Sequence, residues 1–390
     1  MKIARLLVLF FGILSLVRAA EPPVVKRMKA EVSTPLYIQQ AGGVNTIANV
    51  TLTATATPTK PDAPGIVTFV PPLGANGKAV LDSVSKYLVT LHHGWPAGQR
   101  IEISFSVPIA PDDAAAAGLA VATVLDSMFG GWESDPACAV VGHLQPDGKI
   151  LAVRSALARL LTAMRGGTSH ILMPEKNVAE AAADCMVNEG PGGFGRVQMF
   201  AVKDFEEIPQ MAGVKLEPLV AESIAAFDEA QKSLGAVGAD AMALLKKTDT
   251  QESLRTVLEK WPNHVSARLL LGYSIGRNKT LSLAGSAQVI ERSAATLFGS
   301  VSSGHAQDVS KVAPAGLAAD VAALRLIAEK VDPKARPLLD HLVAYGDAAR
   351  TWHAHPPRNV NDAAYYTKTL STEAALALDE RQKLARLIVK

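Results

Sequence analysis

A strand, a tight acidic turn and an apolar helix follow one another without interruption in the first third of this chain. Residues 101–107 alternate apolar and polar side chains, which predicts a half-buried β-strand. Residues 119–130 carry Ala, Leu and Val at helical spacing, and Gly130-Gly131 predicts the end of that helix. The turn between them reads Ala110-Pro-Asp-Asp-Ala-Ala-Ala-Ala-Gly118. Such a turn presents the free N–H groups of a helix N-terminus to a ligand, and the pattern favours a mixed α/β fold.

This turn resembles the active-site segment of the Lon protease proteolytic domain, whose pattern is D-G-P-S-A-G at the entry to a helix. Asp113 takes the place of the Asp, Ala117 of the Ala and Gly118 of the final Gly. Ala114 and Ala115 replace the Gly and the Pro, and Ala116 stands where the family has its nucleophilic Ser. The resemblance therefore includes residues on both sides of the nucleophile position, but the nucleophile itself is replaced.

The resemblance continues downstream in order. Ala139-Val-Val-Gly-His-Leu-Gln-Pro-Asp-Gly-Lys-Ile-Leu151 is similar to the family's hairpin A-M-T-G-E-I-T-L-R-G-R-V-L, with His143 in place of its Glu. Ala152-Val-Arg-Ser-Ala-Leu-Ala-Arg-Leu-Leu-Thr-Ala163 is similar to P-I-G-G-L-K-E-K-L-L-A-A, in which the first Lys is catalytic. Leu157 occupies that Lys position and Arg159 the next one. The segments 171–174 and 199–208 resemble later strands and the last helix of the domain.

Upstream, strands over residues 47–56 and 66–70 and a helix over 78–91 follow the order of the same family. We therefore expect a Lon-type α/β (α+β) proteolytic-domain-like fold over residues 41–212. Residues 21–40 contain prolines and charges and are interpreted as a lead-in segment.

Both members of the family's Ser–Lys dyad are substituted. In that chemistry a Lys of lowered pKa takes the hydroxyl proton, and the Ser then attacks a carbonyl. Ala116 and Leu157 supply neither group, so the resemblance implies an inactive pseudoprotease that binds a polypeptide or scaffolds an assembly. The alternative is an active, secreted, ATP-independent serine-type endopeptidase with rearranged residues, for which Asp113, His143 and Ser155 are the remnants. Asp112 and Asp113 are expected to cap the helix.

Residues 213–390 are helical in pattern. Apolar residues recur at three- and four-residue spacing over 219–234, 251–260, 265–275, 281–297, 315–331, 335–352 and 372–389. The segment from Trp261 to Gly272 resembles the junction between the helices of a tetratricopeptide repeat, although no period of that kind recurs. We expect an all-α, tetratricopeptide-like domain whose groove holds a peptide or a protein.

The N-terminus has the pattern of a secretory signal peptide. A basic start, an apolar run from Leu6 to Val17 and small residues up to Ala20 predict cleavage after residue 20 and a secreted or periplasmic location. The run is too short to span a bilayer. In an oxidising compartment Cys138 and Cys185 either pair or remain free thiols, and the sequence leaves both readings open.

The remaining motifs predict no cofactor and no metal. The net charge of +2 favours no nucleic-acid partner. The absence of G-x-x-x-x-G-K-[ST] predicts no ATP binding. Gly190-Pro-Gly-Gly-Phe-Gly195 precedes a strand, the wrong context for a dinucleotide fingerprint, and is interpreted as a loop. His353-Ala-His355 has no third ligand spaced with it and is interpreted as a solvated loop. The family resemblance implies self-association, because Lon-type domains commonly form rings.

Overall fold

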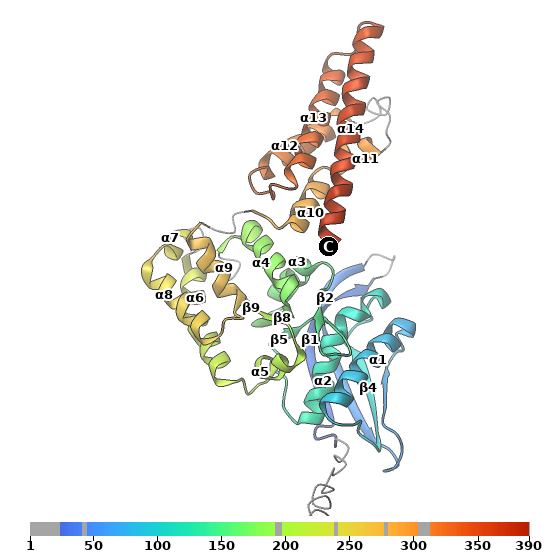
Figure 1. Ribbon diagram of the computed structural model, residues 1–390, viewed down its shortest axis with the longest axis vertical. Helices are drawn as coiled ribbons and strands as arrows, with labels where there is room; N and C mark the ends of the chain where they lie inside the picture. The colour runs from blue at the N-terminus through green and yellow to red at the C-terminus, as the bar shows by residue number, and fades with distance from the viewer. Residues whose placement is uncertain are drawn as a thin grey trace, which may run out of the picture.

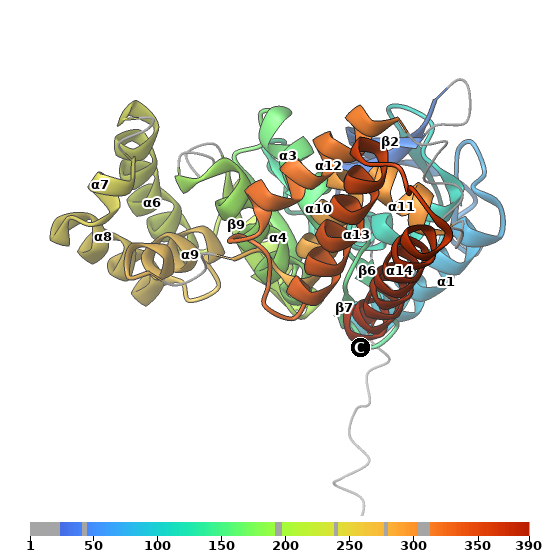
Figure 2. The ribbon, with the colours of Figure 1, turned by 90° about the horizontal axis from the view of Figure 1, so that it is seen from above.

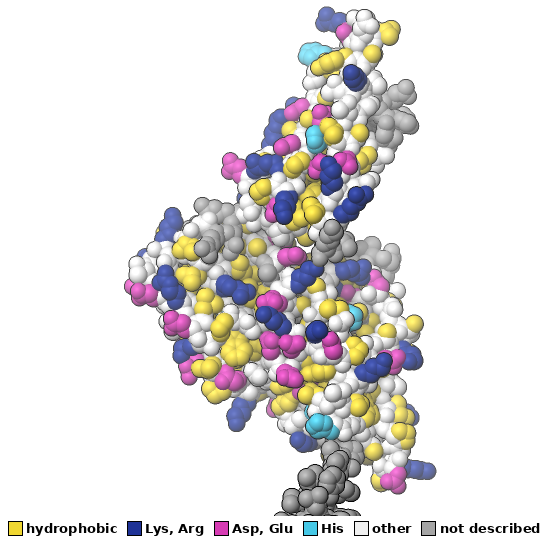
Figure 3. Space-filling view, viewed as in Figure 1, with side chains coloured by type: hydrophobic (Ala, Val, Ile, Leu, Met, Phe, Trp, Pro, Cys, Tyr) yellow, Lys and Arg dark blue, Asp and Glu magenta, His cyan; other side chains and the backbone are white. Residues whose placement is uncertain are grey.

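The computed structural model describes residues 24–40, 45–191, 197–237, 241–276, 280–302 and 313–389. It contains a mixed α/β body followed by helices, as the resemblance predicts (Figure 1). The predicted signal peptide and most of the glycine-rich segment 190–195 lie outside the described residues. Basic and acidic side chains are interspersed over the visible face, with apolar side chains between them (Figure 3).

A seven-stranded sheet forms the centre of the body. Its strand order is β3-β4-β2-β1-β5-β8-β9. The strands are β1 (Lys29–Gln39), β2 (Asn45–Pro58), β3 (Ile66–Phe69), β4 (Gln99–Phe105), β5 (Cys138–Val140), β8 (His170–Pro174) and β9 (Gln198–Val202). Strand β2 is antiparallel to β1 and β4, whereas β5, β8 and β9 run parallel to one another. A separate small hairpin consists of β6 (His143–Leu144) and β7 (Ile150–Leu151).

The interpretation of residues 21–40 as a lead-in segment is wrong, because residues 29–39 form the central strand β1. The side chains of Ala30, Val32, Thr34 and Leu36 alternate into the core. Pro35 obscures this alternation in the sequence, since proline is rare in a central strand. Strand β1 pairs with β5 only at Ser33 and Ala139, so the side of β1 that Pro35 faces has no neighbouring strand at that point.

The predicted strand–turn–helix unit is present. Strand β4 is followed by a 3₁₀ helix, η1 (Pro111–Ala117), and then by α2 (Gly118–Gly130), which ends at Gly131 in the left-handed conformation. Residues 118–129 of α2 are all buried. The window 111–130 is apolar enough for a membrane span, but 89% of it is buried inside the protein, so it is a core helix.

The helices of the body comprise two packed pairs before β9 and a series of helices after it. Helix α1 (Gly74–Leu91) packs on α2, and α3 (Ala156–Arg165) packs on α4 (Glu175–Glu189). After β9 the chain forms η3 (Phe205–Glu207) and α5 (Ile208–Ala212), and then α6 (Pro218–Val237), α7 (Ala241–Leu245), α8 (Thr248–Lys260) and α9 (Val265–Ser274). Helices α6, α7 and α8 lie at the opposite end of the molecule from α1 (Figure 2). The first core continues from the sheet as far as Leu270 in α9.

The last five helices form a second core and extend from the body as an arm (Figure 1). They are α10 (Leu283–Ser293), α11 (Ala295–Ser302), α12 (Pro314–Ile327), α13 (Arg336–Ala354) and α14 (Val360–Val389). The predicted helix 281–297 is divided at Ala294, because the Asp320 carboxylate accepts the N–H groups of Thr296 and Leu297 and starts α11 there. Helix α14 begins twelve residues before the predicted start at Thr372.

The expected helix–turn–helix lies at 248–274, with Trp261-Pro-Asn between α8 and α9. A repeat array stays a prediction. His264 begins α9 and is fully buried: its Nδ1 accepts the Ala267 N–H, and its Nε2 lies 2.8 Å from Gln198 Oε1. Only a neutral ring with its proton on Nε2 satisfies both contacts.

Burial lowers the pKa of His264 from 6.5 to about 3. In the unfolded chain His264 takes up a proton below pH 6.5, whereas in the folded chain it stays neutral until about pH 3. We therefore expect this residue to lower the free energy of unfolding by about 1.4 kcal/mol for each pH unit of acidification within that window. We expect the free energy of unfolding, measured with urea between pH 6.5 and 4, to decrease less steeply with falling pH in His264→Gln than in the natural chain. The exposed His355→Gln variant is the control, and an equal change of slope in both variants would refute the assignment.

Two further predictions concern the cysteines and the segment 353–355. Cys138 and Cys185 are both buried, and no disulfide joins them in the structure. His353 and Ala354 lie in the last turn of α13, so the interpretation of 353–355 as a loop is wrong for these two residues. Among the described residues, no group of three His, Cys, Asp or Glu side chains is placed to hold a metal ion.

Candidate functional site

A buried ion pair occupies the centre of the candidate site. Arg159 on α3 is 0% exposed and Asp113 on η1 is 3% exposed. The guanidinium donates from Nη2 to Asp113 Oδ1 at 2.5 Å and from Nη1 to Oδ2 at 3.0 Å, which is a bidentate pair. Arg159 also donates to the carbonyls of Pro35 and Arg154. Because each buried charge has an opposite charge and further hydrogen bonds, the pair is compatible with its burial.

Tyr37 on β1 connects this pair to the start of α3. Its backbone N–H donates to Asp113 Oδ2 at 2.9 Å, and its ring lies below the Arg159 guanidinium, 5.3 Å from centroid to Cζ. Its hydroxyl is 2.8 Å from Ser155 Oγ. The expectation that Asp112 and Asp113 cap the helix is wrong: Asp113 binds Tyr37 and Arg159, and Asp112 forms an exposed ion pair with Arg154.

The sequence folds this way because β1 is longer than its neighbour β5. Beyond Ser33 the backbone groups on that side of β1 have no strand to pair with. Arg159 binds the Pro35 carbonyl, Asp113 binds the Tyr37 N–H, and the Ala110 N–H donates to the Tyr37 carbonyl. The acidic turn and the start of α3 therefore replace the missing strand.

Ala116, at the predicted nucleophile position, lies in η1, the same turn that contains Asp113. It is 5% exposed, and its carbonyl accepts the Gly142 N–H at 3.0 Å. The hairpin that follows Gly142 thus packs on the entry to α2. His143 is half-buried, and desolvation lowers its pKa from 6.5. The structure gives His143 no hydrogen bond to Asp113 or Ser155 among the described residues, whereas Tyr37 contacts Asp113 through its N–H and Ser155 through its hydroxyl.

Leu157, at the predicted lysine position, faces a different space. It lines a cavity of about 540 Å³ that α3 and α4 form with α10 and the end of α14. Ser155 lines the same cavity and has a left-handed backbone (φ 57°) immediately before α3. A leucine in this position gives the cavity an apolar wall and no titratable group.

One serine contacts an imidazole elsewhere. Ser169 Oγ lies 2.8 Å from His170 Nδ1, while His170 Nε2 lies 3.1 Å from the Met211 carbonyl. This pair is at the amino end of β8, whereas Ala116 contacts Gly142 just past the carboxyl end of the parallel strand β5. Ser169 also donates to the Ala137 carbonyl. It is therefore remote from the predicted site and is explained as a backbone-anchored hydroxyl.

Sequence reasoning missed Tyr37 and the structural role of Arg159. A signal for Arg159 was available: it lies on the same helical face as Leu160 and Ala163, which are buried. A charged residue on a buried helix face requires an opposite charge. Tyr37 carried no comparable signal, because the segment around it was interpreted as a lead-in.

Comparison with known proteins shows that part of this chain is similar to one protease family. Residues 89–186 match the family described as the Lon protease (S16) C-terminal proteolytic domain. The Lon protease of Mycoplasma genitalium is 36% identical over 81 residues, which are 20% of this chain and 10% of that protein. The Lon protease of Mycoplasma pneumoniae is 33% identical over 113 residues, or 28% and 14% of the two chains. That of Chloroherpeton thalassium is 32% identical over 108 residues, or 28% and 12%. The chain thus covers only a small part of these relatives.

Proposed function

Because the chain carries a Lon-type proteolytic domain, we propose that this domain no longer cleaves peptide bonds and that the protein binds or scaffolds polypeptides. The observation that carries the proposal is the pair of substitutions at the dyad positions. The Ala116 side chain is a methyl group and cannot attack a carbonyl, and Leu157 cannot accept a proton. We propose further that residues 1–20 direct export.

The surroundings of these positions support loss of turnover. Asp113, on the same turn as Ala116, and Arg159, on the same helix as Leu157, form a buried bidentate ion pair, and Arg cannot act as a base. Ser155 has the phenolic hydroxyl of Tyr37 as its hydrogen-bond partner, and a phenolic O–H does not supply the base that a nucleophilic serine requires. A serine without a base remains a weak nucleophile.

The test compares the mature chain with the Ala116→Ser, Leu157→Lys double variant. Both are incubated with an unfolded protein, and the released peptides are counted by mass spectrometry. We expect no peptides above background from the natural chain. Cleavage by the double variant would further show that the chain keeps the geometry of the family's active site. The intact mass of the exported protein tests the loss of residues 1–20.

Two controls would detect the alternative, an endopeptidase with rearranged catalytic residues. Cleavage by the natural chain that persists in Ala116→Val would contradict the proposal. Ser155→Ala and Ser169→Ala would then locate the nucleophile, because each hydroxyl has a polar partner and each is removable without a new charge.

A further inference from the structure

The cavity beside Leu157 lies where the arm meets the body. Three helices contribute one stripe each at three- and four-residue spacing. Leu157, Leu161 and Arg165 come from α3; Asn177, Ala181, Asp184 and Asn188 come from α4; and Ala284, Gln288 and Arg292 come from α10. The cavity is therefore a trough between the two cores, with an apolar floor and charged or amide-bearing ends.

Two guanidinium groups in the trough have no carboxylate partner among the described residues. Arg165, at the end of α3, and Arg292, at the end of α10, both line the cavity and are exposed. Arg381 on α14, by contrast, is paired with Glu291 at 2.7 Å. An exposed arginine keeps its charge and offers a planar set of donors to a carboxylate.

Two acidic residues, Asp184 and Glu180, also line the trough. Asp184 accepts hydrogen bonds from the Ser282 N–H (2.7 Å) and hydroxyl (2.8 Å), so its charge is directed to the start of α10. Glu180 is exposed on α4 and forms no ion pair with either arginine among the described residues. The donors of Arg165 and Arg292 are therefore available to the carboxylates of a ligand.

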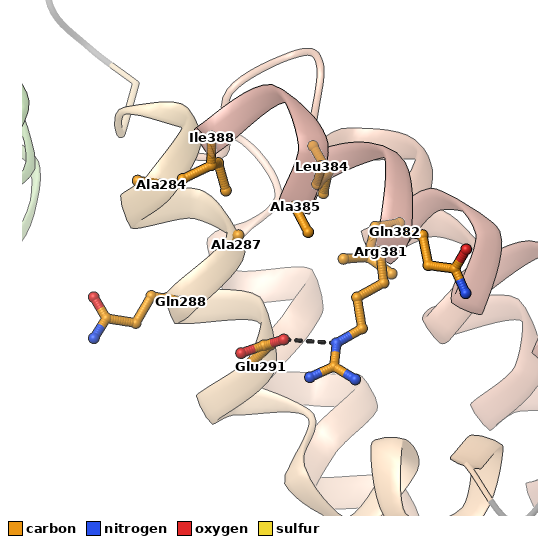
Figure 4. A pocket seen from close by; sticks show the side chains of 10 residues that line it. Ala284, Ala287, Gln288, Glu291, Arg381, Gln382, Leu384, Ala385 and Ile388 are labelled. Atoms are coloured by element: carbon orange, nitrogen blue, oxygen red, sulfur yellow. Dashed lines mark hydrogen bonds and ion pairs between the residues drawn. The ribbon is translucent and has the colours of Figure 1, made fainter. Parts of the chain in front are cut away.

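A second cavity continues the trough along the arm. It has a volume of about 500 Å³ and lies between α10 and α14 (Figure 4). Ala284, Gln288 and Ile388 line both cavities, so the two lie next to each other. Alanines 284, 287 and 385 give it a shallow apolar wall, and the Glu291–Arg381 pair lies at its far end (Figure 4).

The dimensions suit an extended chain. The α3 stripe from Leu157 to Arg165 spans about 12 Å at 1.5 Å per residue. The wall of α10 from Ala284 to Glu291 spans about 10 Å. Each length corresponds to roughly three residues of extended polypeptide at about 3.3 Å per residue.

We propose that this trough binds an unfolded polypeptide segment in which apolar residues alternate with acidic ones. Apolar side chains of the segment contact Leu157, Leu161 and the alanines of α10, and its carboxylates bind Arg165 and Arg292. This inference rests on the proposed function and gives the polypeptide partner a location and a chemistry. Leu157, which stands at the position of the family's dyad lysine, would then form part of the floor of the binding site.

The experiment measures binding of a fluorescein-labelled peptide of alternating leucine and glutamate by anisotropy. The same peptide with lysine in place of glutamate is the charge control. The protein variants are Arg165→Glu/Arg292→Glu, the steric block Ala284→Trp, and Arg268→Glu as a matched change at an exposed arginine of α9 outside the trough. Circular dichroism confirms that each variant is folded.

We expect the double arginine variant to weaken binding of the acidic peptide by about tenfold or more, since two charge-assisted contacts are lost. Arg268→Glu should leave it unchanged, and the lysine peptide should gain affinity for the double variant. Equal affinity of the natural chain and the double variant for the acidic peptide would overturn the trough while leaving polypeptide binding intact. If the natural chain binds neither peptide nor a reduced, unfolded protein, both the trough and the binding role fail.

Discussion

Replacement of Asp113 by alanine is expected to lower the free energy of unfolding by about 3–5 kcal/mol, because it leaves the Arg159 guanidinium buried without its carboxylate. The Tyr37 N–H loses its acceptor in the same variant. Urea unfolding followed by circular dichroism measures the loss. Since the chain has two cores, the transition of the first core is the one that should move.

Two comparisons make this result specific to the buried pair. Asp112→Ala removes the exposed contact with Arg154, whose partners are 62% and 68% exposed, and should cost at most about 1 kcal/mol. The double variant Asp113→Ala/Arg159→Leu should be more stable than Asp113→Ala alone, because it leaves no unpaired buried charge. If Asp113→Ala and Asp112→Ala cost the same, the pair does not stabilise the site.

Replacement of Gly285 by valine is expected to destabilise the joint between body and arm by about 3–5 kcal/mol. A Cβ on Gly285 would overlap the carboxylate of Asp184. The side chain of Asp184 would be displaced, and its two hydrogen bonds to Ser282 would be lost together with the close packing of α4 on α10. Because the trough is formed at this joint, the variant should also lose affinity for the acidic peptide.

Gly299→Ala is the matched control on the neighbouring helix α11. Nothing lies within 4 Å of a Cβ built there, so this change should stabilise the helix slightly, by about 0.5–1 kcal/mol. Thermal unfolding of the two variants measures the difference, and small-angle scattering follows the position of the arm. An arm that keeps both its stability and its position in Gly285→Val would show that the joint tolerates the added volume.

Local patterns were sufficient to predict much of the body. The alternation of residues 101–107, the helical spacing of 119–130 and the turn at Asp147-Gly148 each depend on neighbours a few residues apart, and β4, α2 and the β6–β7 hairpin follow them. The central strand β1 was missed, because its burial is set by β2 and β5 and its proline is tolerated only where β5 has ended. The divided helix at Ala294 was missed for a similar reason, since Asp320 lies on another helix.

The sequence by itself determined the resemblance to the Lon protease proteolytic domain and the identity of the residues at the two dyad positions, because short motifs in order carry both. Only the tertiary structure decided what surrounds those positions. Asp113 and Arg159 are 46 residues apart and form one buried ion pair, and Leu157 opens on a trough whose other wall begins at Ala284. Such contacts depend on how distant elements pack, because burial and charge pairing are properties of the folded neighbourhood and leave no fixed spacing in the chain.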